Sequence, residues 1–245
     1  GNTPAAAAAN ITPATISSVT NLVADSKVYD GGLSATFNSA TATFNGMLSG
    51  DNLAIGATTA TFSDKNAGTG KAVNVSSLTL GGADAGNYVL AGTTATGTGT
   101  ITPKALTITG MSAVNKIYDG TTRATLSGGS ISGLVGSETL GVTGVAANFD
   151  TKDAGTSKTV TATGSTLVNG GNGGLAANYT ISNPTGLTAS ILPRTLTVTG
   201  VTATTRAYDG TLAATLSGGS LWGLVSGETL VVSGGTGTFA DKNAG

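Results

Sequence analysis

A repeat of about 90 residues constrains this sequence more than any other feature. The tripeptide Tyr-Asp-Gly occurs at Tyr29-Asp30-Gly31, at Tyr118-Asp119-Gly120 and at Tyr208-Asp209-Gly210, with spacings of 89 and 90 residues. Solenoid repeats are about 20 to 50 residues long, so a period of this length indicates one whole domain per copy. The function is therefore expected to depend on repetition.

A second motif, Ile-x-Pro, recurs in phase with the first and marks the joints between copies. It occurs at Ile11-Thr12-Pro13, Ile101-Thr102-Pro103 and Ile191-Leu192-Pro193. Proline fixes φ and lacks a backbone donor, so it suits a strand end or a stiff junction. We expect the following division: residues 1–13, the end of a preceding repeat or a linker strand; residues 14–103 and 104–193, two complete modules; and residues 194–245, a third module without a counterpart of residues 156–190.

Strand patterns dominate each copy. After the second joint the chain reads Leu106-Thr107-Ile108-Thr109, in which apolar residues alternate with threonine, as expected for a half-buried strand. Runs of this kind, separated by Gly, Asn and Asp, give about seven short strands per copy. The sequence therefore predicts an all-β chain of tandem modules, each an antiparallel two-sheet sandwich of the immunoglobulin type. A β-grasp-like module with one short helix is the alternative.

The composition excludes several classes of function. The chain has no cysteine and no histidine, which rules out disulfides, thiolate chemistry and imidazole bases, and removes the commonest zinc ligands. Only 9% of residues are charged and the net charge is -1, with no basic stripe for nucleic acid or anionic lipid. No apolar run reaches the ~18 residues of a membrane span, so no membrane insertion is expected. Residues 1–10 have no signal-peptide pattern, and we expect an internal piece of a longer protein.

The Tyr-Asp-Gly tripeptide is interpreted as a structural signature. A base lies two residues before each tyrosine and should share its strand face, at Lys27, Lys116 and Arg206. Asp-Gly is a strong hairpin-turn signal because glycine tolerates the positive φ that such turns need. The alternative, a cluster of functional carboxylates, is disfavoured because the aspartates fall at repeated turn positions. We therefore expect each tyrosine to be a packing anchor, and we expect no catalytic residue and no enzyme activity.

Three phenylalanines precede loops rich in acids, amides and lysine, at Phe62, Phe149 and Phe239. We expect the phenylalanines in the core. Ten of the eleven bases occupy equivalent positions, so we expect the basic residues to form framework ion pairs or to lie in turns, and not to form a binding patch. Oxygen ligands in these loops could hold calcium, but the loops lack the spaced acids and closing glutamate of a helix-loop-helix site. No cofactor is therefore expected, and calcium is the open alternative.

One position breaks the repeat. Trp222, the only tryptophan, aligns with Asn45 and Ser132, which are small and polar. Apolar residues precede this position in all three copies, so its side chain should face away from the core. An exposed tryptophan can stack on a sugar or anchor a partner, which makes Trp222 the candidate ligand-binding or partner-binding residue. The alternative is that it packs against a neighbouring module or loop.

Motifs that recur in order and in phase resemble the YDG-type repeats of large bacterial exoproteins, the filamentous-haemagglutinin-like adhesins. In the first copy they are Lys27-Val28-Tyr29-Asp30-Gly31, Asp64-Lys65-Asn66-Ala67-Gly68, Ala85-Gly86-Asn87-Tyr88 and Ile101-Thr102-Pro103. The likeness covers nearly the whole chain from Ile11 onward. It implies a Gram-negative protein exported to the cell surface, often by two-partner secretion, that works in adhesion or biofilm cohesion. Such repeats usually form a stalk, so the resemblance assigns no catalytic residues.

We therefore expect a secreted, extracellular structural or adhesive repeat region. Its expected partners are other copies of itself, neighbouring repeats, surface glycans or matrix polysaccharide, and a carbohydrate-binding module that uses Trp222 is the alternative function. The incomplete third copy should expose strand edges. Residues 1–13 of one chain could complete that copy in another chain by strand addition and build head-to-tail fibres. A plain excerpt from a longer repeat array is the other interpretation.

Overall fold

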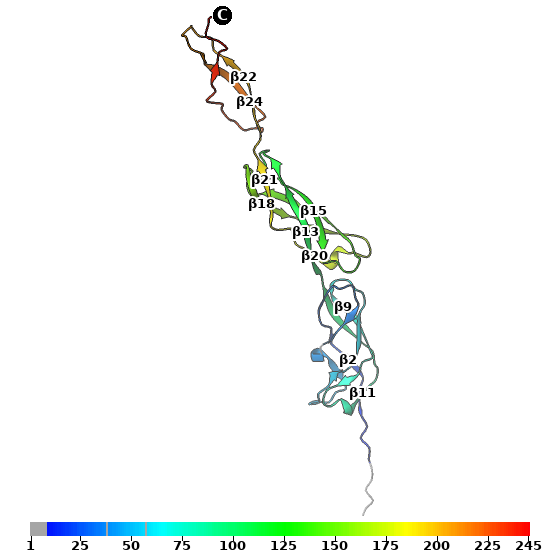
Figure 1. Ribbon diagram of the computed structural model, residues 1–245. Helices are drawn as coiled ribbons and strands as arrows, with labels where there is room; N and C mark the ends of the chain where they lie inside the picture. Colours follow the sequence, from blue (N-terminus) through cyan, green and yellow to red (C-terminus); the bar gives the residue numbers. More distant parts are fainter. Residues whose placement is uncertain (1–8, 38, 57) are drawn as a thin grey trace, which may run out of the picture. The chain divides into compact units, whose positions relative to one another are not determined.

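The computed structural model describes residues 9–37, 39–56 and 58–245, and this part of the chain is all-β (Figure 1). Threonine and valine are β-branched and favour extended backbone, which explains why strands prevail. Helical structure in the described residues is confined to three 3-10 turns: η1 (Ser39–Thr41), η2 (Ala85–Asn87) and η3 (Ala176–Asn178). The predicted all-β class is confirmed.

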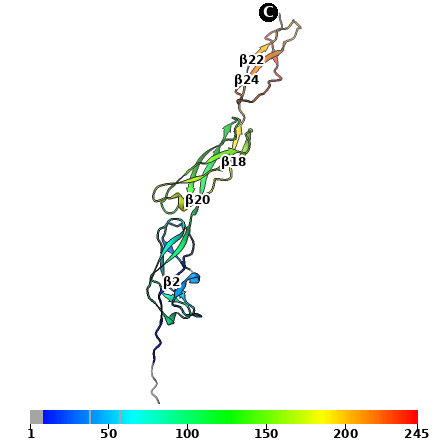
Figure 2. The same cartoon turned by 180° about the vertical axis from the view of Figure 1, so that it is seen from behind.

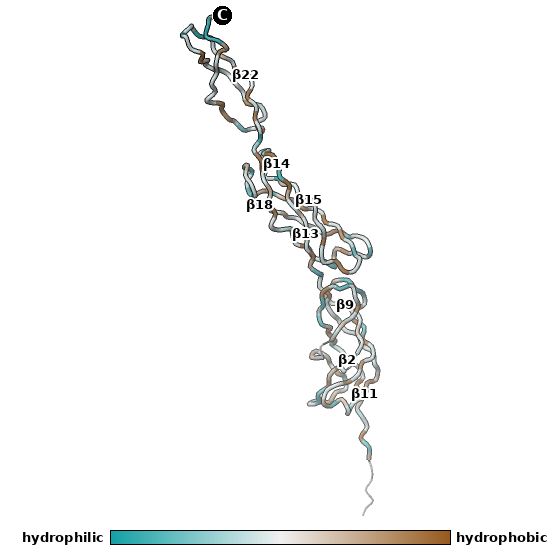
Figure 3. The backbone as a smooth tube through the Cα atoms, viewed as in Figure 1, coloured by the Kyte–Doolittle hydropathy of each residue, from teal (hydrophilic) through white to brown (hydrophobic). Residues whose placement is uncertain are grey.

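Apolar residues are spread in short stretches along the strands, interspersed with polar ones (Figure 3). This is the pattern of strands that bury one face and expose the other. Among the described residues, no helix has the length and hydropathy needed to cross a bilayer.

The chain divides into two compact units, and the division does not follow the repeat. The first unit contains the chain as far as Thr109, together with Ser130–Val145 and Gly164–Asn183. The second unit contains Gly110–Gly129, Ala146–Thr163 and Pro184–Gly245. The second copy of the repeat thus contributes to both units. Each unit therefore contains one junction between successive copies.

The first unit contains the first copy and part of the second; β2 and β20 belong to it and are marked in Figure 2. Its strands in the first copy are β1 (Ala14–Ile16), β2 (Ser18–Thr20), β3 (Leu22–Val23), β4 (Lys27–Val28), β5 (Ser34–Ala35), β6 (Thr43–Asn45), β7 (Ala54–Ile55), β8 (Thr59–Phe62), β9 (Gly68–Ser76), β10 (Leu80–Gly81), β11 (Tyr88–Leu90) and β12 (Ala95–Thr102). From the second copy it contains β16 (Leu140–Thr143), β19 (Thr166–Asn169) and β20 (Tyr179–Ile181). Two longer strands, β13 (Lys104–Val114) and β15 (Thr125–Ser132), begin in one unit and end in the other.

The largest sheet of the first unit has the order β3-β12-β9-β8-β5, with β4 also paired to β12. Phe62 of β8 lies opposite Val73 of β9, and both are almost fully buried. A second apolar cluster gathers Ile16, Phe44 and Tyr88 with their neighbours at the other end of the same copy. The first copy therefore has an apolar core along its whole length.

The second unit repeats this arrangement with equivalent residues. Its strands are β14 (Lys116–Ile117), β17 (Ala146–Phe149), β18 (Gly155–Thr163), β21 (Leu187–Leu192), β22 (Thr197–Ala203), β23 (Ala213–Ala214), β24 (Leu216–Trp222) and β25 (Gly237–Thr238). One sheet has the order β14-β21-β18-β17, in which Phe149 lies opposite Val160 as Phe62 lies opposite Val73. In the third copy, β22 pairs with β24 and β23 with β25, both antiparallel.

The structure corrects the expectation that pairing would be antiparallel alone. The first strand of each complete copy pairs in parallel with the strand after the 3-10 turn: β1 with β11, and β13 with β20. The strand before the first and the second Tyr-Asp-Gly also pairs in parallel with the last strand of its copy: β4 with β12, and β14 with β21. Parallel neighbours need a long crossover, and local turn signals in a sequence do not reveal such pairs.

The expected closing strand within residues 1–13 falls partly on residues 1–8, which lie outside the described residues. Residues 9–13 form no strand, Ile11 is fully exposed, and the first strand begins at Ala14. The division into modules at 13/14, 103/104 and 193/194 stays a prediction.

Candidate functional site, a joint between successive repeats

The Tyr-Asp-Gly turn of the first copy is held by its aspartate. Asp30 Oδ1 accepts hydrogen bonds from the backbone N–H of Gly32 and from Lys27 Nζ, both at 2.8 Å. Gly31 has a φ of 78°, the left-handed conformation that glycine adopts without strain. The predicted turn is therefore present, but it is not a hairpin, because β4 pairs with β12 and β5 pairs with β8.

The tyrosine of this turn points into the next copy of the repeat. Tyr29 is only 1% exposed, and its hydroxyl donates a hydrogen bond of 2.6 Å to Glu138 Oε1. Glu138 is itself 7% exposed and lies 109 residues further along the chain. A buried carboxylate is costly unless it is paired and hydrogen-bonded. The junction therefore contains a buried carboxylate, that of Glu138, which needs hydrogen-bond donors around it to be stable.

Two further donors complete the coordination of Glu138. Lys65 Nζ lies 2.9 Å from Oε1, and the Tyr179 hydroxyl donates to Oε2 at 2.7 Å. The rings of Tyr29 and Tyr179 meet edge to face, with centroids 5.2 Å apart. Tyr29 and Lys65 come from the first copy, whereas Glu138 and Tyr179 come from the second. The carboxylate therefore has all its partners only when the two copies are in contact.

Local structure explains how Glu138 and Tyr179 come together. Glu138 lies in a turn after β15, closed by its own N–H, which donates to the carbonyl of Val135 at 3.1 Å. The N–H of Val135 donates to the Tyr179 hydroxyl at 3.0 Å. Tyr179 begins β20, directly after the 3-10 turn η3, and β20 pairs in parallel with β13. The turn and the strand thus present one acid and one phenol on the same side of the second copy.

An amide contact flanks the carboxylate. Asn178 is fully buried; its Oδ1 accepts from the N–H of Ala67 at 2.8 Å, and its Nδ2 donates to Asn66 Oδ1 at 3.0 Å. The loop that supplies Lys65 therefore makes both an ion pair and side-chain hydrogen bonds across the junction.

Apolar packing surrounds these polar groups. One hydrophobic cluster contains Tyr29, Phe62 and Ile101 of the first copy together with Leu106 and Tyr179 of the second. The junction is therefore a continuous core, and burial of apolar surface at about 25 cal/mol per Å² adds to its polar contacts.

Burial and hydrogen bonding act in opposite directions on Glu138. Burial raises the pKa of its carboxyl, but the hydrogen bonds from Tyr29, Lys65 and Tyr179 outweigh burial and hold that pKa below its ordinary value. Burial, together with the hydrogen bond to Glu138, raises the pKa of Tyr179 to about 12. The same two causes raise the pKa of Tyr29. The carboxylate therefore stays charged and both phenols stay neutral at neutral pH.

The glycine of the motif also belongs to the junction. A Cβ atom at Gly31 would lie 2.9 Å from Cγ1 of Val135 in the next copy. At Gly120 the equivalent atom would lie 2.8 Å from Cγ1 of Val225. Glycine is therefore required at these positions both for its backbone conformation and for the close approach of the following copy.

The same joint occurs in the second unit, between the second and third copies. Tyr118 donates to Glu228 Oε1, Lys152 Nζ lies 3.4 Å from the same oxygen, and Asp119 Oδ1 accepts from Lys116 at 2.7 Å. Each residue occupies the position of its counterpart in the first joint. The residues that recur in the sequence thus form the same tyrosine–glutamate contact in both units.

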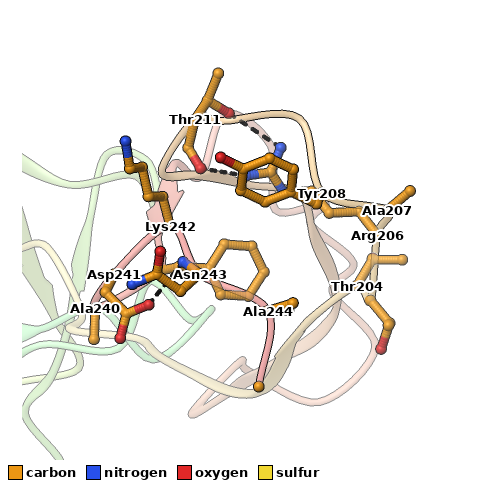
Figure 4. A pocket seen from close by; sticks show the side chains of 14 residues that line it. Thr204, Arg206, Ala207, Tyr208, Thr211, Ala240, Asp241, Lys242, Asn243 and Ala244 are labelled. Atoms are coloured by element: carbon orange, nitrogen blue, oxygen red, sulfur yellow. Dashed lines mark hydrogen bonds between the residues drawn. The ribbon is translucent and has the colours of Figure 1, made fainter.

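Tyr208 of the third copy and Asp51 of the first copy occupy the positions of the joint tyrosine and the joint acid. Tyr208 and Lys242 of the third copy are exposed. Figure 4 shows both among the side chains that line one pocket, with the hydrogen bonds between Arg206 and Thr211 as dashed lines. Tyr208 is 67% exposed, and a Cβ atom added at Gly210 would meet nothing within 4 Å. In the first copy, Tyr88 donates to Asp51, the counterpart of Glu138, without a tyrosine from a preceding copy among the described residues.

Seven of the eleven basic residues form ion pairs in the part of the chain that the structure describes, whereas Lys104, Arg123, Arg194 and Lys242 form none there. The pairs with nearby aspartates are Lys27–Asp30, Lys71–Asp64, Lys116–Asp119, Lys158–Asp150 and Arg206–Asp209. The base before each tyrosine also lies over a phenylalanine ring: Lys27 over Phe62, Lys116 over Phe149 and Arg206 over Phe239. Phe62 and Phe149 are buried as expected, and Phe239 is half-buried.

The structure places Trp222 on the surface of the third copy. Its side chain is 75% exposed, and it lies in β24 opposite Thr197 of β22. It is not part of either joint. In the portion of the chain that the structure describes, no group of three or more acidic side chains is placed to hold a metal ion.

Sequence reasoning missed Glu138 and Glu228 as the partners of the tyrosines. The signal that identifies them is the equivalence of Asp51, Glu138 and Glu228, one acid at the same place in each copy, four residues after an apolar position. Glu138 and Glu228, together with Lys65 and Lys152, are the charged residues of the two joints.

A family model described as YDG domain matches the chain three times, at residues 12–96, 102–186 and 192–245. Each match contains one Tyr-Asp-Gly turn and one of the equivalent acids Asp51, Glu138 and Glu228. Comparisons with curated proteins and with solved structures give no match. The three matches cover most of the chain, which therefore belongs to the YDG domain family.

Proposed function

We propose that this chain is part of the structural and adhesive repeat region of a protein secreted to a bacterial cell surface. In this proposal each Tyr-Asp-Gly turn holds one repeat against the next. The observation that carries it is the recurrence of the joint, Tyr29 with Glu138 and Tyr118 with Glu228. A contact that is rebuilt in every repeat suits a spacer or stalk, because its stability is a sum of repeat and junction terms. The resemblance of the motifs to haemagglutinin-like adhesins supports the extracellular location and the role in adhesion or biofilm.

At the level of the fold, we propose a module of about 90 residues with a two-sheet sandwich core for each complete copy. The three matches in phase with the repeat support the module length. The separate strand sets of the first copy, the large sheet on β12 and the smaller pairs β1-β11 and β2-β6, support two layers.

Distance measurements between two labels test whether the joint holds its copies in one arrangement. The chain has no cysteine, so Ala83→Cys and Thr143→Cys, both exposed and both in the first unit, provide unique label sites in two copies. Pulsed electron resonance should give a narrow distance distribution for the otherwise unchanged chain and a broad one after Glu138→Ala. Asp51→Ala is the matched control, since it removes the equivalent acid outside the joint and should leave the distribution narrow. A distribution that is equally broad with and without Glu138 would overturn the proposed function.

Fibre formation by strand complementation is part of the proposal. Residues 1–13 of one chain would add to the third copy of another. Deletion of residues 1–13 should then abolish fibres in electron micrographs, and unchanged fibres after the deletion would exclude this route.

A carbohydrate-binding role at Trp222 is the second candidate. It is supported by the exposure of this side chain, 75%, on a strand rich in serine and glycine. Glycan arrays with the unchanged chain and with Trp222→Ala distinguish the two functions. Binding that is lost with Trp222→Ala supports the lectin role, whereas no binding, or equal binding by both chains, removes it.

A further inference from the structure

Four glycines lie where the second copy is divided between the two compact units. Gly110, Gly128, Gly144 and Gly164 are each within two residues of a boundary of a unit. All four have a positive φ, between 69° and 79°. We call these glycines, together with Ser165, the boundary residues of the second copy.

The glycines approach each other through their backbones. A Cβ atom at Gly128 would lie 2.7 Å from the carbonyl oxygen of Gly110. A Cβ atom at Gly144 would lie 2.8 Å from the carbonyl oxygen of Gly164, and one at Gly164 would lie 2.7 Å from that of Gly144. Approaches this close leave no room for side chains. The strands at these positions therefore have no side-chain packing of their own, and glycine has the greatest backbone freedom of any residue.

Ser165 adds an unsatisfied polar group to the boundary residues. Its hydroxyl oxygen is buried and has no hydrogen-bond partner among the residues that the structure describes. Its backbone N–H donates to a side chain, Asn183 Oδ1, at 2.9 Å. A buried hydroxyl without a partner destabilises the packing around it.

The first copy lies entirely within one unit and has an apolar core at the equivalent place. Leu78, the counterpart of Ser165, is 2% exposed and belongs to the apolar cluster that contains Phe44. Phe37 packs against this cluster and also against the cluster that contains Phe62. Apolar packing therefore continues through the first copy where the second copy has a buried serine.

The first copy also has a side-chain hydrogen bond where the second copy has a glycine. Asn21, the counterpart of Gly110, has a φ of 55° and donates from Nδ2 to Thr43 Oγ1 at 2.9 Å. Thr43 corresponds to Ser130, so the second copy keeps the acceptor hydroxyl and lacks the donor. Two copies of one fold thus differ in the side chains that hold this place together.

We propose that the boundary residues of the second copy are a hinge, and that the first copy is stiffer at the equivalent place. Each part of the second copy keeps its contacts with its own neighbouring copy, so that bending occurs within this repeat and not at the joints. Hinges are a few residues, often small, that absorb backbone changes between packed parts. This inference goes beyond the proposed function, since it concerns the chain whether or not the protein is secreted or adhesive.

Two label pairs at equivalent places test the hinge. The chain has no cysteine, so Thr159→Cys with Thr180→Cys brackets the boundary of the second copy, and Ala72→Cys with Val89→Cys brackets the equivalent place in the first copy. All four residues are exposed. Pulsed electron resonance should give a distance distribution about twice as wide in the second copy as in the first, because a hinge samples several orientations. Equal widths would overturn the inference.

Transfer of a first-copy residue tests which residues form the hinge. Gly110→Asn should let the new amide donate to Ser130, and a Cβ atom at Gly110 meets nothing within 4 Å, so the variant should fold. It should reduce the width of the second-copy distribution by about half, since asparagine has less backbone freedom than glycine. Gly200→Asn is the matched control: it has a similar φ, 71°, and the same open space, but it lies in the third copy and should leave the width unchanged.

The reciprocal change should loosen the first copy. Asn21→Gly removes the side-chain donor, and the double variant Asn21→Gly with Leu78→Ser also removes the buried leucine. The distribution between labels 72 and 89 should widen with the first variant and widen further with the second, while far-UV circular dichroism checks that both are folded. Unchanged widths in Gly110→Asn and in Asn21→Gly would show that these residues are not the hinge. Both label pairs lie within single copies, so these results are separate from the label distances across the first joint, which test the proposed function.

Discussion

At the scale of single residues, Glu138 explains how a chain with few charges specifies a junction. A carboxylate loses its hydration when it is buried, and it regains stability only through donors placed around it. The donors of Glu138 are Tyr29, Lys65 and Tyr179, which come from three separate segments of two copies. A shifted arrangement of the copies would leave the carboxylate buried without these partners. The residue therefore favours one register of the copies over others.

The pH dependence of stability should report this residue. The pKa of Glu138 lies below its ordinary value of 4.5, so its contribution is fully present above pH 4.5 and is lost as the pH falls through the folded-state pKa. The pKa of Tyr179 is raised from 10.0 to about 12, so its contribution is present below pH 10 and is lost as the pH rises toward 12. The free energy of unfolding, measured with urea, should therefore be nearly constant between about pH 4.5 and pH 10 and should decrease below and above that range.

Glu138→Gln separates this carboxylate from the other acids that titrate below neutral pH. The aspartates of the ion pairs, such as Asp30 and Asp119, also have lowered pKa values. They are present both in the unchanged chain and in the Glu138→Gln variant, so they do not contribute to the difference between the two. The variant should lose about 1 to 3 kcal/mol at pH 7, because hydrogen bonds to a charged group become hydrogen bonds to a neutral one. As the pH falls, the free energy of unfolding of the variant should decrease less steeply than that of the unchanged chain. Parallel pH profiles would contradict the assignment of Glu138.

At the scale of the structural element, the Asp-Gly turn has two functions that the sequence shows only in part. Its aspartate and its positive-φ glycine could be predicted because Asp-Gly is a turn signal on its own. The burial of Tyr29 against Glu138 could not be predicted, since the two residues are 109 positions apart and the sequence around one does not indicate the other. The parallel pairs β1-β11 and β13-β20 escaped prediction for the same reason, because strand patterns give the period of a strand and not its neighbour.

The two roles of the turn glycine can be separated by comparing two equivalent positions. Gly31 and Gly210 have nearly the same φ, 78° and 79°, so an alanine at either position meets the same backbone strain, about 1 to 2 kcal/mol. At Gly31 the new methyl group would also lie 2.9 Å from Val135, whereas at Gly210 it would meet nothing. Gly31→Ala should therefore destabilise the chain by about 1 to 3 kcal/mol more than Gly210→Ala, the usual cost of overpacking.

Thermal unfolding of the two single variants measures this difference. The double variant Gly31→Ala with Val135→Ala supplies the control, because truncation of Val135 makes room for the added methyl group. The added cost of Gly31→Ala should then shrink toward that of Gly210→Ala. Equal destabilisation by the two single variants would show that the turn needs glycine for its backbone alone.

At the scale of the whole molecule, the repeat in the sequence and the compact units in the structure have different boundaries. The second copy gives residues 130–145 and 164–183 to the first unit, where they pack on Tyr29 and Phe62 of the first copy. Its other segments, 110–129 and 146–163, pack in the second unit. Sequence similarity follows the copies, whereas the compact units of the structure follow the joints between copies. One part of the second copy is therefore stabilised by contacts with the first copy, and the other part by contacts with the third copy.

Removal of the first copy should consequently affect only one part of the second. In a fragment of residues 104–245, Glu138 loses the donors Tyr29 and Lys65, and the apolar surface around Tyr179 becomes exposed. Hydrogen exchange followed by mass spectrometry should then show faster exchange in 130–145 and 164–183 than in the full chain. Segments 110–129 and 146–163 should keep their protection, because local stability follows local packing. A uniform loss of protection across the second copy would mean that each copy folds as one unit, and that the joint adds contacts without dividing the module.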